Sequence, residues 1–253
     1  MLAAAAVCPH PPLLVPELTG AAGLRGAGSP AEAGPGRRAG DAGDLADLGV
    51  LRAACDAAVA GLTGARPDLI VVVGGAAATA AYDGSAAGSL RDFGVDYAVG
   101  AGEPVLPLSL TLGSWLLRRA GADLGRTRLQ AVARATPAAG CLRLGAEIAR
   151  KAPRVAVLAM GDGPARWAVG IKGAADPDAE RYQAEVAAAL AGGDPARLAR
   201  LAPALDDELV IAGRAAWQVL AGAAAGRRLR GQLRCALTRY EVGYLVASWD
   251  VCG

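Results

Sequence analysis

The sequence predicts a three-layer α/β protein with a largely parallel central sheet and a C-terminal antiparallel hairpin. Three short apolar runs, Leu2–Val7, Leu69–Val73 and Val155–Ala159, do not alternate with polar residues, which is typical of strands buried on both faces. Segments with helical spacing separate these runs, as expected for parallel strands joined by helices. Two consecutive strand patterns close the chain and predict the hairpin. With 253 residues and no evident linker, residues 1–253 are expected to form a single domain.

The first half of the chain begins with the strand Leu2–Val7 and a proline-rich loop. The next segment, Gly20–Gly43, is crowded with Gly, Ala and Pro, and we interpret it as a flexible surface insertion. Apolar residues at helical spacing then predict a helix over 44–62, which ends before the strand 69–73. Residues 76–94 are small and are expected to form a loop.

The second half alternates helical and strand patterns up to the closing hairpin. The expected elements are strands at 95–99, 128–133, 155–159, 229–237 and 240–249, and helices at 108–120, 137–151, 178–191, 195–201 and 206–225. The hairpin turn is expected near Thr238 and Arg239.

Composition and charge argue against a nucleic-acid-binding protein and against a membrane protein. The 26 Lys and Arg residues nearly balance the 24 Asp and Glu residues, and the net charge of +2 argues against a nucleic-acid partner. No apolar run is long enough to predict a transmembrane helix, so no membrane partner is expected. The five cysteines are dispersed without C-x-x-C spacing, which is typical of reduced thiols and favours a cytoplasmic location.

His10 is the only histidine of the chain, and it lies directly after the first predicted strand. The neighbouring prolines, Pro9, Pro11 and Pro12, restrict the backbone and would hold the imidazole in one direction. Such a residue can serve as a metal ligand or as an acid or base. It can also be a hydrogen-bonded structural residue that shapes the proline loop, or bind a ligand without a metal. The residues alone leave these alternatives open.

Ligands of open α/β sheets bind at the carboxyl ends of the strands. His10, Gly74–Gly75 and Gly161–Asp162–Gly163 each follow a predicted strand. We therefore expect His10 and Asp162 to face one crevice and to be the catalytic pair of any active site. Three further carboxylates on loops or helix starts could supplement this site, namely Asp83, Glu103 and Glu208.

Several segments resemble, in matching order, the catalytic B subunit of class III extradiol ring-cleavage dioxygenases and the related Memo-type proteins. The resemblance begins with the segment from Cys8 to Glu17 and extends over most of the chain. The other matching segments, which are most similar to B-subunit-like proteins of high-GC bacteria, are 66–75, 106–110, 160–163, 212–222 and 242–249.

The resemblance implies an α/β fold that binds non-haem iron at the strand ends. In active relatives two histidines and a carboxylate hold Fe(II) and leave positions for a catechol and O₂, and a further histidine acts as acid and base. Within this set, His10 corresponds to one metal ligand. Gly74–Ala77 stands where a second ligand would be expected, Gly161–Gly163 replaces the acid/base histidine, and Ala212–Gly213 stands near the third ligand.

Two functional hypotheses follow from the resemblance. The first is a divergent oxidoreductase that acts on a small aromatic molecule with Fe(II), or another divalent metal, in an altered site that includes His10. The second is a non-catalytic protein of the same fold that binds a metabolite or takes part in an assembly. Because relatives of this kind pair with other subunits, a homo-oligomer is also an expectation.

Overall fold

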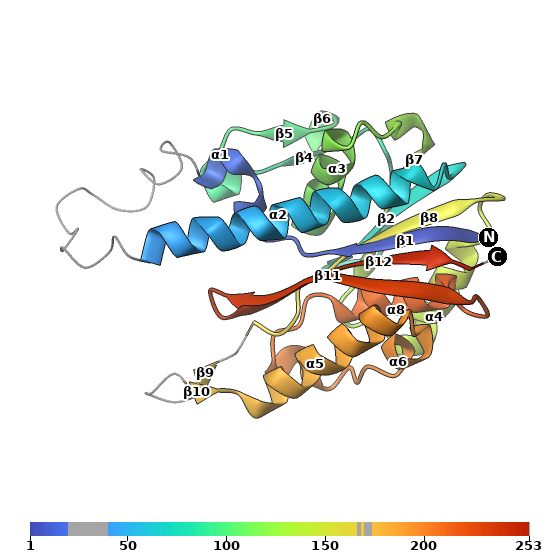
Figure 1. The fold of residues 1–253 in the computed structure, drawn as a ribbon. Coiled ribbons are helices and arrows are strands. Elements are labelled where there is room, and N and C mark those ends of the chain that lie inside the picture. The colour runs from blue at the N-terminus through green and yellow to red at the C-terminus, as the bar shows by residue number, and fades with distance from the viewer. Residues whose placement is uncertain (20–39, 166–167, 170–173, 253) are drawn as a thin grey trace.

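A computed structural model describes residues 1–19, 40–165, 168–169 and 174–252. Its centre is a seven-stranded sheet with the strand order β11-β12-β1-β8-β2-β7-β3 (Figure 1). The strands are β1 (Leu2–Cys8), β2 (Leu69–Ala76), β3 (Ala80–Asp83), β7 (Thr127–Ala133), β8 (Val155–Met160), β11 (Leu229–Arg239) and β12 (Val242–Val251).

The middle of the sheet is parallel and its edges are antiparallel. β1, β8, β2 and β7 are parallel neighbours, whereas β12 pairs antiparallel with both β1 and β11, and β3 pairs antiparallel with β7. The predicted parallel centre and C-terminal hairpin are therefore confirmed. The unalternating apolar runs form β1, β2 and β8, which have helices packed on both faces and are almost entirely buried.

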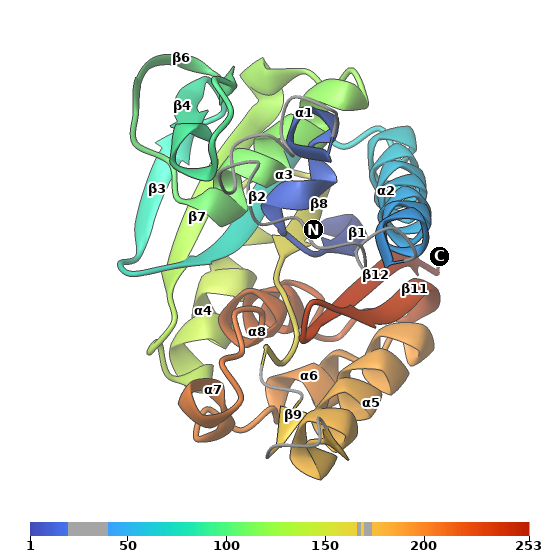
Figure 2. The same cartoon turned by 90° about the vertical axis from the view of Figure 1, so that its left-hand side faces the viewer.

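Helices cover both faces of the sheet (Figure 2). α2 (Gly40–Gly64) and α3 (Leu108–Arg119) lie on one face, and α4 (Ala138–Ile148), α5 (Pro177–Gly192), α6 (Pro195–Ala199) and α8 (Arg214–Ala223) lie on the other. Successive side chains of β1 point to opposite faces, so Ala6 and Cys8 belong to the core under α2 and α3, whereas Ala5 and Val7 belong to the core under α8.

The remaining elements are short. They are α1 (Pro16–Thr19), α7 (Leu205–Glu208), β4 (Ala86–Ser89), β5 (Ala98–Val99), β6 (Ala101–Pro104), β9 (Ala168–Val169), β10 (Ala174–Ala175) and 3₁₀ turns at 12–14, 91–93 and 124–126. Among the described residues, no helix has both the length and the apolar character that crossing a membrane requires.

The predicted loop at 76–94 is wrong, because this segment contains β3 and β4. Alanine and glycine have low strand propensity, but Ala80–Asp83 is held by pairing with β7. The Gln130 side chain also donates a hydrogen bond to the Ala80 carbonyl at 3.0 Å. Pairing with a neighbouring strand therefore overrides local propensity here.

The predicted helix at 206–225 is interrupted between α7 and α8. Val210 has a positive φ of 52° in this break, and Leu209 and Ile211 on either side of it are buried. Burial of the side chains of Leu209 and Ile211 therefore holds the backbone in a non-helical conformation at Val210.

Two further boundaries differ from expectation. The hairpin turn lies at Tyr240–Glu241, where both residues have positive φ (51° and 59°), rather than at Thr238–Arg239, which belong to β11. A turn with two positive φ values matches the right-handed twist of the paired strands. Of the predicted insertion at 20–43, residues 40–43 belong to α2, and residues 20–39 lie outside the described residues.

Candidate functional site at the carboxyl ends of the strands

The structure brings His10 and Asp162 together. β1 and β8 are parallel neighbours, and Cys8 pairs with Met160 at their carboxyl ends. Two residues further along, the backbone N–H of His10 donates a hydrogen bond to Asp162 Oδ1 at 2.8 Å. The carboxylate therefore fixes the proline loop to the end of β8.

The imidazole lies beside the same carboxylate without a hydrogen bond to it. His10 Nδ1 is 3.6 Å from Asp162 Oδ1, which is too long for a hydrogen bond and suits an ion pair when the ring is protonated. The two side chains are 11% and 16% exposed. Nδ1 itself is buried and has no hydrogen-bond partner, so the ring is not satisfied in the way expected of a purely structural histidine.

The neighbouring strand end, Gly74–Gly75, is closed by other backbone and side chains. Ser109 Oγ donates a hydrogen bond to the Gly75 carbonyl at 2.9 Å. A β-carbon at Gly74 would lie 2.3 Å from this Oγ, and one at Gly75 would lie 2.9 Å from the Ala212 carbonyl oxygen. A larger side chain at either glycine would require its neighbours to move.

The end of β8 is equally tight. A β-carbon at Gly161 would lie 2.4 Å from Gly213 Cα and 3.1 Å from Trp217 Nε1. The Ala212–Gly213 segment thus packs directly on Gly75 and Gly161. It offers close backbone contact where the resemblance would place a ligand side chain.

These residues do not fit the iron site that the resemblance implies. That site requires two imidazoles and a carboxylate, and this strand edge supplies one imidazole and one carboxylate. Throughout the described part of the chain, no three or more His, Cys, Asp or Glu residues group in a way that could hold a metal ion.

The other candidate carboxylates do not supplement the pair. Asp83 lies opposite Arg128, near the amino end of β7 and thus at the opposite edge of the sheet, and its side chain is 79% exposed. Glu103 and Glu208 are exposed as well.

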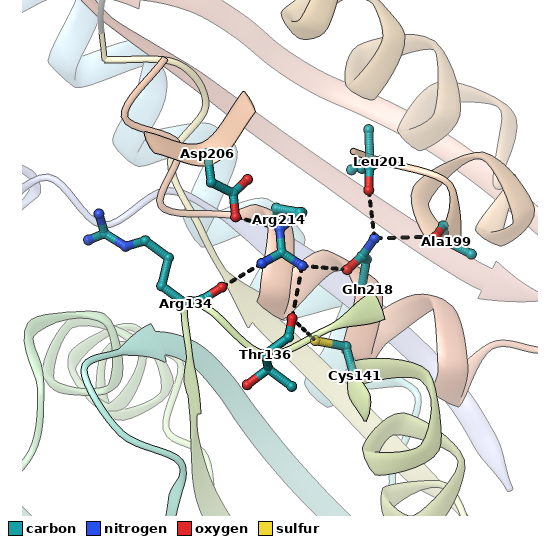
Figure 3. A network of polar contacts seen from close by, with 8 residues as sticks. All are labelled: Arg134, Thr136, Cys141, Ala199, Leu201, Asp206, Arg214 and Gln218. Carbon is teal, nitrogen blue, oxygen red and sulfur yellow. Dashed lines mark hydrogen bonds and ion pairs between the residues drawn. The ribbon is translucent and has the colours of Figure 1, made fainter. Parts of the chain in front are cut away.

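Sequence reasoning missed the buried arginine that organises the break between α7 and α8. Arg214 is 1% exposed and forms an ion pair with Asp206, which is also buried. Figure 3 shows that the other N–H groups of the Arg214 guanidinium also make hydrogen bonds. They donate to the carbonyls of Arg134 and Thr136 and to Gln218 Oε1, and Gln218 Nε2 donates in turn to the carbonyls of Ala199 and Leu201.

This Arg214 network joins three parts of the chain. It connects the segment after β7, the end of α6 and the first turn of α8. It therefore positions the Ala212–Gly213 segment next to the strand ends. Because its acceptors are mainly backbone carbonyls, no sequence motif marks it.

The thiol closest to His10 in sequence is not available for chemistry. Cys8 is completely buried. The Cys8 thiol contacts a second buried cysteine, Cys55. The hydrogen bond between the two thiols and burial raise the pKa of Cys55, so the Cys55 thiol stays protonated.

A sizeable cavity lies far from this site. Its volume is about 540 Å³, and Arg128, Lys151 and Tyr82 are among its lining residues. It opens where β2 and β7 begin, at the edge opposite His10.

Comparison with protein-family models finds no match, and comparison with curated proteins finds none either. Among solved structures, an uncharacterized protein from Escherichia coli K12 is similar to this chain, with 16% sequence identity and a TM-score of 0.49. The similarity covers 77% of this chain and 91% of the other.

Proposed function

We propose that the chain is a class III extradiol dioxygenase B-subunit-like protein that binds a small aromatic molecule at His10 and Asp162, with altered metal chemistry. The observation that carries the proposal is the position of His10. Its nearly buried ring stands at the carboxyl end of a parallel strand, beside a carboxylate and with Nδ1 unpartnered. This edge is where α/β sheets bind ligands.

The pair supports binding and proton transfer. The backbone N–H of His10 holds Asp162 in place, and the carboxylate lies 3.6 Å from the imidazole Nδ1. An imidazole in this setting can accept a proton from a ligand hydroxyl group and return it. A phenol or catechol offers such a hydroxyl group. No step through Fe(II) follows from this donor set.

The second candidate is a non-catalytic binding or assembly protein on the same fold. The closed packing at Gly74, Gly75 and Gly161 favours it, because the strand edge has backbone contacts where a metal site would need donor side chains. A binding experiment shows whether the strand edge is a ligand pocket or only part of the fold. A turnover experiment then shows whether a protein that binds the ligand is an enzyme.

The proposal is tested by titrating the protein with 4-nitrocatechol and following the absorbance of the probe. The wild-type protein should bind it, and His10→Ala should weaken binding about tenfold or more, because the ring would be lost. Asp83→Asn, at the opposite edge, is the matched control and should leave binding unchanged. Failure of the wild type to bind any member of a catechol panel would overturn the proposal.

Turnover and metal content are measured separately. The purified protein is analysed for iron, zinc and manganese, and a catechol panel is then supplied after anaerobic loading with Fe(II). Stoichiometric metal that disappears in His10→Ala, together with coloured ring-opened products, would establish the oxidoreductase. Binding without turnover would favour the non-catalytic protein.

We also propose a cytoplasmic location, because the dispersed cysteines suit reduced thiols. A homo-oligomer is proposed from the resemblance alone. Light scattering of the purified protein measures its mass and tests this directly.

A further inference from the structure

A third polar side chain lies next to the His10–Asp162 pair. β1 lies between β8 and β12 in the sheet. Ala4 pairs with Asp250 and Val7 pairs with Ala247, so Tyr244 lies on β12 three residues beyond the last pair, toward the loop after β1 that carries His10. Asp162 follows β8, the other neighbour of β1, and accepts a hydrogen bond from the His10 N–H. His10 and Asp162 thus stand in the loops after two strands, and Tyr244 lies on the adjacent strand.

Two backbone hydrogen bonds join the loop after β8 to β12, the strand that carries Tyr244. The Gly163 N–H donates to the Gly243 carbonyl and the Gly243 N–H donates to the Pro164 carbonyl, both at 2.8 Å. The residue after Asp162 is thereby joined to the residue before Tyr244. A β-carbon at Gly163 or Gly243 would lie 2.3 or 2.5 Å from Gln183 Oε1, so a larger residue at either position would require the Gln183 side chain to move.

Tyr244 shares a face of the sheet with the strand residues that precede the pair. Cys8, Met160, Val246 and Tyr244 all belong to the core under α2 and α3. His10 and Asp162 follow Cys8 and Met160 by two residues, beyond the ends of β1 and β8. Asp162 lies close enough to Tyr244 for its charge to act on the phenol.

The environment keeps the Tyr244 phenol as a hydrogen-bond donor. The residue is 4% exposed, and burial together with the nearby Asp162 carboxylate raises its pKa. Its hydroxyl makes no hydrogen bond with any described residue. The site thus combines the Tyr244 hydroxyl with His10 Nδ1, which is buried and makes no hydrogen bond with a described residue.

We infer that Tyr244 is a specificity-determining residue of the His10 site, where its hydroxyl donates a hydrogen bond to a ligand hydroxyl oxygen. The inference rests on the proposed function. The ligand class it selects is a neutral hydroxylated aromatic molecule, because the Asp162 carboxylate beside the imidazole disfavours an anionic group. A ligand hydroxyl can accept from Tyr244 and donate to the imidazole at the same time.

The test compares two probes that differ in their hydroxyl groups, 4-nitrocatechol and nitrobenzene, in the full-length protein at a mildly acidic pH at which 4-nitrocatechol is uncharged. Tyr244→Phe keeps the ring in the core and removes only the hydroxyl. It should weaken binding of 4-nitrocatechol about fivefold and leave binding of nitrobenzene unchanged, as expected for the loss of one hydrogen bond. Tyr82→Phe, on β3 at the far edge of the sheet, is the matched control and should change neither.

The outcomes separate this inference from the proposed function. If the wild type binds 4-nitrocatechol and His10→Ala weakens it, but Tyr244→Phe binds as the wild type does, Tyr244 has no role in selection and only this inference falls. If Tyr244→Phe weakens both probes equally, the hydroxyl acts on packing and the inference is likewise overturned. If the wild type binds no catechol, the proposed function fails and this inference fails with it.

Discussion

The protein has two buried polar clusters near the carboxyl ends of its strands, and their central side chains, Arg214 and His10, differ in how well their hydrogen-bonding groups are satisfied. In the Arg214 network, the guanidinium donates to a carboxylate, two backbone carbonyls and an amide oxygen (Figure 3). At the His10 site, Nδ1 has no partner and stands 3.6 Å from the nearest carboxylate oxygen. A satisfied cluster stabilises the fold, whereas an unsatisfied one leaves its hydrogen-bonding capacity for a ligand or water.

The largest expected effect comes from breaking the satisfied cluster. Arg214→Met should lower the free energy of unfolding by about 3–5 kcal/mol, because it leaves the buried Asp206 carboxylate without its cation. Urea unfolding followed by circular dichroism measures the loss. Arg91→Met removes a guanidinium from the exposed ion pair with Asp96 and should leave the unfolding midpoint unchanged. Equal effects of the two substitutions would contradict the structural role of Arg214.

The second effect concerns the packing between the two clusters. Gly161→Ala should destabilise the protein by about 1–3 kcal/mol, because the new methyl group would meet Gly213 Cα at 2.4 Å. Gly192→Ala is the matched control, since its β-carbon would meet no atom within 4 Å. Thermal unfolding of both variants gives the comparison. A Gly161→Ala protein as stable as the wild type would show that the Ala212–Gly213 segment moves freely.

The smallest effect on stability is expected at the unsatisfied site. Asp162→Asn keeps an oxygen that can accept from the His10 N–H, so we expect a loss of about 1 kcal/mol or less. The same variant should weaken 4-nitrocatechol binding clearly, since the neutral amide removes the carboxylate that lies beside the imidazole. A loss of stability as large as that of Arg214→Met, without a change in binding, would make Asp162 a structural residue and remove the contrast.

The elements that could be predicted from sequence are those whose signal is local. The apolar runs of β1, β2 and β8 and the periodic helices were visible in the residues themselves. β3 and β4 were not, because their small residues become strands through pairing with distant segments. The break at Val210 depends on packing and had no local marker either.

The site divides in the same way. His10 and Asp162 could be paired in advance because parallel strands end at one edge, and this reasoning needs only the order of the strands. Tyr244 depends on the register between β1 and β12, and Arg214 depends on the carbonyls of Arg134 and Thr136 in the segment after β7. Neither register nor backbone acceptors can be inferred from residue types.

The strand that precedes His10 has four alanines among its seven residues, and this has a consequence for how the site can vary. Ala5 and Ala6 lie on opposite faces of β1, which contacts α8 and α2. Because the side chains of Ala5 and Ala6 are single methyl groups, the helices on the two faces pack close to this strand. A bulkier residue in place of either alanine would push a helical layer outward and tilt the proline loop. The position of the imidazole can therefore change through substitutions several residues away from His10.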